Sequence, residues 1–466
     1  MTSQHSHTRS RFCASFPLPL LGGVGKIMAH FLIQRPGKAD PLMMSQPHSD
    51  LSHPQRPWWA RRRYIYFGLT VLIGALSSYS QVLSVFRDQL QDYLNIGLRK
   101  YGLLLSAGAI PGAIGALGAG VLIHRAHPRA VIRLALVGGA VGLGLIAWRG
   151  PSYQRMIIAA MIVAASGQAL FISIQSHVVE LFPQQRRRAL SVYLVVVSAA
   201  GMFYPVWAEF LLARSENDPA VDFGSVLHWP FGVVAILVVA GSFLYRQGKA
   251  RSPTSDPQGA GGAGEAAPRW SELWPLVGML VLHGTADTAC WTWMPRVLDS
   301  PSFTEMPYLP GHVMAAFGLA YVVSRSMLAL MPDHFGRRSM LVLPGICGGG
   351  LMLAGVLSRD YTLTVAGYVG GAFLWSFEMP AITAEISRRA GRRFGLVISV
   401  GSVVGGAGVF VLTNAMAKLG APPSPPEQLW RILLLPAACF PCVGIGGAIW
   451  LWRHRMARTV SETPRE

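Results

Sequence analysis

The chain has 466 residues, of which 52% are hydrophobic and only 13% are charged. A soluble domain carries about 25% charged residues, so this composition excludes an ordinary water-soluble protein and indicates one that crosses a membrane several times. The formal net charge is +18. In a soluble chain this charge would favour nucleic-acid binding, but here the basic residues form short clusters between apolar runs. That pattern is typical of membrane topology, and no nucleic-acid partner is expected.

Residues 1–60 are predicted to form a disordered cytoplasmic extension. Their apolar stretch from Phe16 to Ile33 is interrupted by prolines, glycines and a lysine, so it is a poor signal peptide and too broken to span a bilayer. The five histidines of the extension are irregularly spaced, which does not favour a metal site.

Twelve apolar runs follow, each near the length of about 20 residues that a membrane-spanning helix needs. They predict helices over 64–86, 101–123, 130–148, 156–179, 189–212, 228–245, 273–295, 310–331, 339–357, 362–384, 394–417 and 430–452. The fold class is therefore an all-α integral membrane protein with two six-helix bundles. The bundles are expected over 61–245 and 273–455, joined by a flexible cytoplasmic linker over 246–272 and followed by a cytoplasmic tail over 456–466.

The basic residues predict the orientation of these helices. With the N-terminus inside, 21 basic residues lie at predicted inner ends and ten at predicted outer ends. Such a bias favours both termini in the cytoplasm of a bacterial-type inner membrane.

The two halves of the chain carry related loop motifs. Glu180-x-x-Pro183-x-x-x-Arg187-Arg188 follows the fourth predicted helix, and Glu385 with Arg392-Arg393 follows the tenth at an offset of 205. Arg125 and Arg129 follow the second, and Asp333-x-x-Gly336-Arg337-Arg338 follows the eighth, where Arg338 matches Arg129 at an offset of 209. Two matches at nearly one offset indicate a parallel duplication.

These motifs resemble those of the major facilitator superfamily. Asp333-x-x-Gly336-Arg337-Arg338 is similar to that family's loop motif, with Ala329 and His334 as departures, and the first-half copy from Gly120 is more eroded. The Glu180 motif resembles one found after the fourth span in sugar porters. The resemblance implies two six-helix bundles that rock about a central substrate site. It also favours a cytoplasmic gate, in which acids and arginines on neighbouring helices hold one state, over simple retention of arginines inside. The residues of this gate would be Asp333, Gly336, Arg337, Arg338, Arg125, Arg129, Glu180, Arg187, Arg188, Glu385, Arg392 and Arg393.

Four ionisable residues fall inside predicted spanning helices, where each is costly: His283, Asp287, Arg325 and Glu378. Asp287 lies roughly 21 Å from the inner end of its helix, and Arg325 and Glu378 lie roughly 9 Å from theirs. His283 and Asp287, four residues apart, share a helix face. We expect Asp287 to bind a coupled proton and Arg325 to attract a carboxylate or phosphate. The alternatives are a static Arg325–Glu378 salt bridge and an Asp287 in the wetter outer third of the membrane.

Polar side chains on the first-half helices are further candidates for binding. Gln81 lies on the first predicted helix, and Gln168 and Gln175 lie on the fourth. Such groups can hydrogen-bond a substrate, but bonds between helices are the alternative for each of them.

The sequence contains no phosphate-binding loop, nucleophile elbow or paired metal ligands, so we expect no enzyme, cofactor or metal. The function that fits is a secondary active transporter of a small polar or anionic organic solute, with a proton as the candidate coupling ion and the lipid bilayer as surroundings. A monomer is expected. The alternatives are a proton-linked exporter of amphipathic compounds and a non-transporting membrane sensor.

Overall fold

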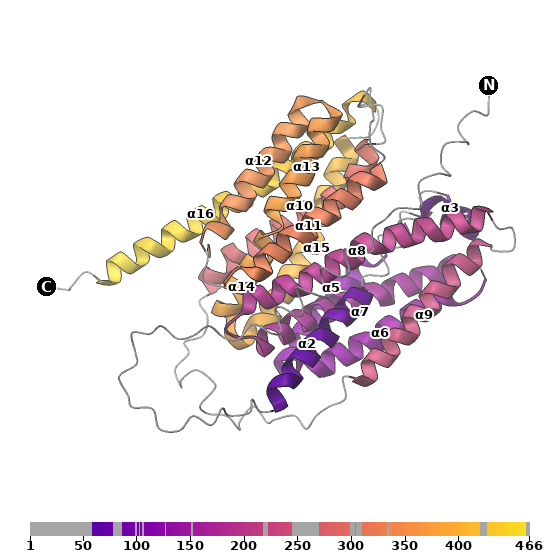
Figure 1. Cartoon of the computed structure of the whole chain (residues 1–466), viewed down its shortest axis with the longest axis horizontal. Helices are drawn as coiled ribbons and strands as arrows, with labels where there is room; N and C mark the ends of the chain where they lie inside the picture. The colour runs from indigo at the N-terminus through magenta and orange to yellow at the C-terminus, as the bar shows by residue number, and fades with distance from the viewer. Residues whose placement is uncertain are drawn as a thin grey trace. The chain divides into compact units, whose positions relative to one another are not determined.

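The structure is a computed structural model that describes residues 58–77, 86–97, 100–101, 103–104, 107–125, 127–150, 152–217, 222–244, 270–298, 303, 310–332, 336, 338–419 and 426–462. All regular elements in this part are helices (Figure 1). The first half contains α2 (Trp58–Ser77), α3 (Arg87–Leu94), α5 (Ala109–Arg125), α6 (Pro128–Ala147), α7 (Tyr153–Leu181), α8 (Arg186–Asn217) and α9 (Phe223–Leu244). The second half contains α10 (Trp270–Leu298), α11 (Pro310–Leu330), η3 (Ser339–Leu341), α12 (Leu343–Ser358), α13 (Tyr361–Trp375), α14 (Glu378–Ala390), η4 (Gly391–Arg393), α15 (Phe394–Leu419), η5 (Pro426–Leu433) and α16 (Leu434–Glu462).

The predicted helical runs fall on these helices, which supports a multi-pass membrane protein. Six described segments are long and apolar enough to cross a bilayer: Pro128–Ala147, Tyr153–Leu181, Phe223–Phe243, His312–Leu330, Phe394–Leu419 and Gln428–Arg453. Three shorter apolar helices are Tyr64–Ala75, Ala109–Arg125 and Leu343–Ser358. The predicted disordered extension up to residue 57 and most of the predicted linker lie outside the described residues.

Local side chains set several helix ends. Pro128 occupies the first turn of α6, where its missing N–H is not needed, and the preceding His127 Nδ1 accepts a hydrogen bond from the Arg129 N–H at 3.2 Å. The Asp360 carboxylate caps α13 by accepting from Leu363 N at 2.7 Å. Gly391 ends α14 with a φ of 50°, a conformation that glycine adopts without strain.

One predicted helix is divided. The sequence predicts a single helix over 362–384, whereas the structure has α13 ending at Trp375 and α14 beginning at Glu378. At the break, Phe377 N donates to Leu374 O at 3.3 Å, a tightened three-residue turn. The apolar run continues through the break, so periodicity alone could not reveal it. The break places Glu378 in the first turn of α14, where the helix dipole favours a carboxylate.

Glycines let the helices of the second half approach closely. A Cβ atom on Gly355 of α12 would lie 2.5 Å from Leu363 O of α13, and one on Gly367 would lie 2.7 Å from Leu351 O. These contacts join the two backbones as small residues do in membrane helix pairs. Elsewhere in the apolar core of this half, the rings of Trp375 and Phe440 stack with centroids 4.0 Å apart.

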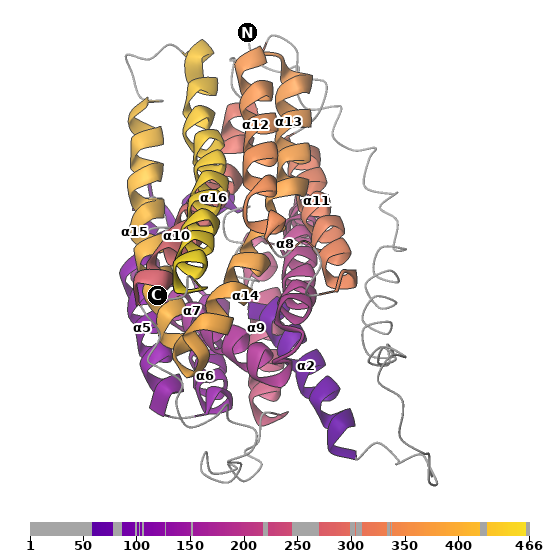
Figure 2. The same cartoon turned by 90° about the vertical axis from the view of Figure 1, so that its left-hand side faces the viewer.

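The chain divides into two compact units, Met1–Thr70 and Val71–Glu466. Within the second unit, α8 packs against α11 and α14, and α15 packs against α5 and α7 (Figure 2). These four pairs join helices of the two predicted halves. The boundaries of the predicted bundles at 61–245 and 273–455 stay a prediction.

Candidate functional site

A chain of hydrogen bonds joins α10, α11 and α13 around Tyr321. The Tyr321 hydroxyl donates to Asp287 Oδ1, and it accepts from Trp375 Nε1 at 2.5 Å. Tyr321 and Trp375 are buried, and Asp287 is half-buried. The predicted proton-binding carboxyl is therefore held by a buried aromatic partner on the neighbouring helix.

Arg325 lies one helical turn beyond Tyr321 on α11. Its guanidinium stands 4.5 Å from the centroid of the Tyr321 ring, and its side chain is almost wholly buried. Its Nη1 donates to Ser198 Oγ and to Leu194 O at 3.5 Å, both on α8. No carboxylate among the described residues forms an ion pair with Arg325, and its Nε has no hydrogen-bond partner there. The arginine thus bridges helices of the two predicted halves through neutral acceptors.

Glu378 pairs with His283. Its Oε2 lies 2.8 Å from His283 Nδ1, and both residues have 0% exposure. The His283 ring also meets Phe440 edge to face, with centroids 5.7 Å apart. Glu378 Oε1 and His283 Nε2 are buried without a hydrogen-bond partner in the described part of the chain. The Arg325–Glu378 pair that the sequence left open is thus not formed, and His283 and Asp287 on one face of α10 have separate partners.

The predicted polar residues of the first half have different surroundings. Gln175 is buried in α7, whereas Gln168 on the same helix is exposed. Gln81 lies outside the described residues. No group of three His, Cys, Asp or Glu residues in the described ranges could hold a metal ion.

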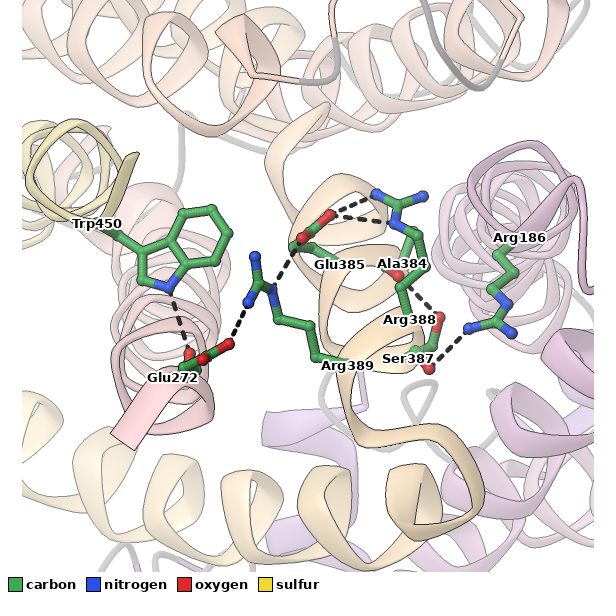
Figure 3. Close-up of polar contacts among 8 residues, drawn as sticks. All are labelled: Arg186, Glu272, Ala384, Glu385, Ser387, Arg388, Arg389 and Trp450. Atoms are coloured by element: carbon green, nitrogen blue, oxygen red, sulfur yellow. Dashed lines mark hydrogen bonds and ion pairs between the residues drawn. The ribbon is translucent and has the colours of Figure 1, made fainter. Parts of the chain in front are cut away.

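A second polar cluster joins the first turn of α10, the last turn of α14 and the middle of α16 (Figure 3). Arg389 is placed between two carboxylates: its Nη1 binds Glu272 Oε2, and its Nε binds Glu385 Oε1 at 3.0 Å. Arg388 binds the other oxygen of Glu385 through Nη2 at 2.7 Å and Nε at 3.1 Å. The Arg389 guanidinium also covers the Trp450 ring at 4.6 Å, and Trp450 Nε1 donates to Glu272 O at 3.2 Å. We call these five residues the carboxylate–arginine cluster.

Three consecutive arginines at the start of α8 reach the second half. Arg186 Nη1 donates to Ser387 O at 2.7 Å, as Figure 3 shows. Arg187 Nη2 donates to Pro332 O, and Arg188 Nε donates to Ala329 O at 2.8 Å. These bonds hold the arginine-rich ends of the two predicted halves together.

The remaining predicted gate residues are spread more widely. Gly336 has a φ of 62°, and this left-handed turn explains a glycine at that point of the loop motif. Glu180 is half-exposed, and its Oε2 lies 4.0 Å from Nδ1 of the buried His177. Arg125 and Arg338 are exposed, and Arg129 and Arg393 are half-buried. Asp333, Arg337 and the side chain of Arg392 lie outside the described part.

The sequence did not single out Tyr321, Ser198, Glu272 or Arg389. Tyr321 precedes Arg325 by four residues, so helical spacing could have placed both on one face. Glu272 is the last residue of the predicted linker, but in the structure it lies within the first turn of α10. The contacts of Ser198 and Arg389 depend on which helices are neighbours, and a single sequence does not give this.

Comparisons with known proteins agree on one family. The family model described as Major Facilitator Superfamily matches residues 64–413. A structure of FucP, a transporter of that superfamily in its outward conformation, matches with a TM-score of 0.66 and 16% identity over 83% of this chain and 99% of that one. A variant of the E. coli fucose:proton symporter FucP gives 0.64 and 16% over the same shares. The proton:xylose symporter XylE gives 0.67 and 14% over 84% and 96%. No curated protein sequence matches the chain.

Proposed function

Because the chain belongs to the major facilitator superfamily, we propose that it is a secondary active transporter of a small polar or anionic organic solute. The family and the similar structures favour a transporter over an enzyme. In this proposal twelve spans form two bundles of six in the inner membrane, with α13 and α14 together making one span and both termini in the cytoplasm.

The buried guanidinium of Arg325 supports an anionic substrate. A buried cation is costly unless a negative group compensates it. In the described part of the chain, Arg325 contacts a hydroxyl, a carbonyl and an aromatic ring, and no carboxylate lies within ion-pair distance of it. It lies where α11 meets α8, which is the boundary between the proposed bundles. A carboxylate or phosphate on the solute would supply the missing charge.

Two buried or half-buried carboxyl groups support coupling to protons. Asp287 has one hydrogen-bond donor, the Tyr321 hydroxyl, and Glu378 has His283. Glu378 Oε1 and His283 Nε2 have no hydrogen-bond partner among the described residues, so this buried pair can bind one more proton. FucP and XylE, whose folds this chain shares, are proton symporters. We assign the coupled proton to Asp287, with His283 four residues before it on α10 and Glu378 bound to that histidine from α14.

The contacts of α8 fit one state of an alternating-access cycle. Arg186, Arg187 and Arg188 bind main-chain oxygens of the second half. Passage of a solute on this side requires those bonds to break, so the proposal identifies the present arrangement as the state closed at the arginine-rich ends.

The test is a thermal-stability panel of organic anions, lipophilic cations and neutral sugars on the purified full chain, followed by flux in proteoliposomes. Anions should raise the midpoint by mass action, Arg325→Ala should remove the shift, and Arg325→Lys should restore part of it. Lys418→Ala, which removes an exposed charge at the end of α15, is the control and should keep the shift.

Other outcomes would replace the proposal. Stabilisation by lipophilic cations that depends on Asp287 would favour the exporter. Stabilisation by neutral sugars that survives Arg325→Ala would favour a sugar transporter, as FucP and XylE are. Anion binding without flux would favour the sensor, and a blank panel would contradict the assignment of Arg325.

A further inference from the structure

A groove runs between α10 and α16, and neither Asp287 nor Arg325 lines it. It encloses about 320 Å³, which is at the lower end of the range of about 300–1,000 Å³ for small-molecule sites. Its walls are mostly apolar: Pro275, Gly278 and Leu282 come from α10, and Val443 and Gly446 come from α16. One end of the groove is polar and is formed by Ser271 and Arg453.

The groove opens on an apolar face. Ile445 and Ile449 on α16 are each about half exposed, at 50% and 49%, and Trp274 on α10 is 50% exposed. Side chains of this kind on a membrane-spanning helix face lipid. Trp270 and Trp274 stack with centroids 5.7 Å apart near the polar end, as tryptophans do at the boundary between the bilayer and water.

Glycine makes the groove deep. A Cβ atom added to Gly278 would meet nothing within 4 Å, so the wall of α10 is open there. A Cβ atom on Gly446 would meet only Met279 Cγ, at 3.4 Å, and Met279 Sδ, at 3.9 Å. The space beside these residues fits a linear apolar chain lying along the two helices.

The polar end carries positive charge. Arg453 is exposed, and no described carboxylate forms an ion pair with it. The nearby acid, Glu272, is already bound by Arg389. A basic end on an apolar groove between helices is the arrangement that binds anionic lipid head groups on the cytoplasmic side of membranes.

We propose that the groove between α10 and α16 binds an anionic phospholipid, with an acyl chain along Gly278 and Gly446 and the phosphate at Arg453. This site requires the chain to lie in a bilayer, and it does not require the chain to transport anything. The bound head group would lie beside Glu272 and Trp450, which belong to the carboxylate–arginine cluster.

The experiment compares phosphatidylglycerol and phosphatidylcholine with the same acyl chains. Each lipid is titrated into the delipidated full chain in detergent, and both the thermal midpoint and lipid adducts in native mass spectrometry are measured. Phosphatidylglycerol should bind more tightly. Arg453→Gln should weaken it about fivefold while leaving phosphatidylcholine unchanged, because one basic residue at an anionic surface contributes about that factor.

Gly278→Leu should weaken both lipids, because its side chain fills the groove. Two controls match these changes. Gly350→Leu adds the same side chain on α12, where a Cβ would also meet nothing within 4 Å. Arg133→Gln removes one positive charge near the start of α6. Both should bind lipid as the unaltered chain does.

A preference for phosphatidylglycerol that survives both Arg453→Gln and Gly278→Leu would overturn the proposal. So would equal binding of the two lipids by the unaltered chain. Inorganic phosphate that reproduces the full shift would show a simple anion site instead. None of these measurements involves solute flux. Failure of the lipid proposal can therefore be distinguished from failure of the transport proposal.

Discussion

His283 Nδ1 lies 2.8 Å from Glu378 Oε2, and neither residue is exposed. The contact joins α10 to the first turn of α14, so the turn after the break in the tenth predicted helix is fixed to the helix that carries Asp287. It predicts how the protein responds when either partner is removed.

His283→Ala should destabilise the protein by about 3–5 kcal/mol, because it leaves a buried carboxylate without its partner. Glu378→Gln should cost less, since the amide keeps the shape and can still bond the imidazole. The double variant His283→Ala/Glu378→Ala should be more stable than the sum of the two Ala variants predicts. Denaturant unfolding of the unaltered chain, His283→Ala, Glu378→Ala and the double variant measures the coupling free energy between the two side chains. Additive effects would show that the contact contributes nothing to stability.

This pair shows what the sequence could and could not predict. Depth along each helix could be counted from the apolar runs, so the sequence correctly placed His283, Asp287, Arg325 and Glu378 inside helices. Partners depend on helix rotation and on which helices are neighbours, and no single-sequence pattern encodes either. The sequence therefore left the pairing of Arg325 open. In the structure Arg325 hydrogen-bonds Ser198, and Glu378 hydrogen-bonds His283.

Tyr321→Phe should lower the thermal midpoint, although the aromatic ring is kept. The variant removes the hydroxyl that joins Asp287 to Trp375, and an unsatisfied buried polar group costs about 1–3 kcal/mol. The ring remains packed on Phe317 at 4.8 Å. Tyr368→Phe is the matched control, because the Tyr368 hydroxyl makes only long contacts, at 3.5 Å to Cys290 O. Equal losses in the two variants would contradict the role of the Tyr321 hydroxyl.

Glu385→Gln should destabilise the protein more than Glu272→Gln, although both carboxylates bind Arg389. The Glu385 side chain is 3% exposed and also binds Arg388, whereas the Glu272 side chain is 36% exposed. Loss of a buried partner costs about 3–5 kcal/mol, and loss of an exposed one about 0–1 kcal/mol. Thermal midpoints at low and high salt separate the two cases, since salt should weaken only the Glu272 contribution. A larger loss of stability in Glu272→Gln than in Glu385→Gln would show that the Glu272 carboxylate on α10 contributes most to the cluster.

The cap of α6 should make stability depend on pH. Partial burial lowers the pKa of His127 below its ordinary value of 6.5, Arg129 and His177 lower it further, and Glu180 opposes them. The neutral Nδ1 accepts the Arg129 N–H, and a protonated ring cannot accept it. Below pH 6.5 the unfolded chain binds more protons than the folded one, so this stability is present above 6.5 and is lost as the pH falls toward the folded pKa.

His127→Asn is the test of this dependence. Asparagine keeps a capping acceptor and does not titrate, so the variant should lose less stability than the unaltered chain between pH 7.5 and pH 5. Thermal midpoints across that interval measure the difference. Identical curves for the two proteins would assign the acid sensitivity to other groups.

The turn at Ser376 and Phe377 divides residues 361–390 into two short helices, α13 and α14. Helix α13 packs against α11 and α12, whereas α14 packs against α10 and against α8 of the first half. Across the turn, Ser376 N donates to Ala372 O at 3.1 Å and Phe377 N donates to Leu374 O at 3.3 Å, so one backbone bond is tightened there. Such a turn inside a membrane-spanning stretch is where α14 can change its angle to α13. We therefore expect that the bonds of Arg186, Arg187 and Arg188 to the second half can break while the aromatic stack of Trp375 and Phe440 stays intact.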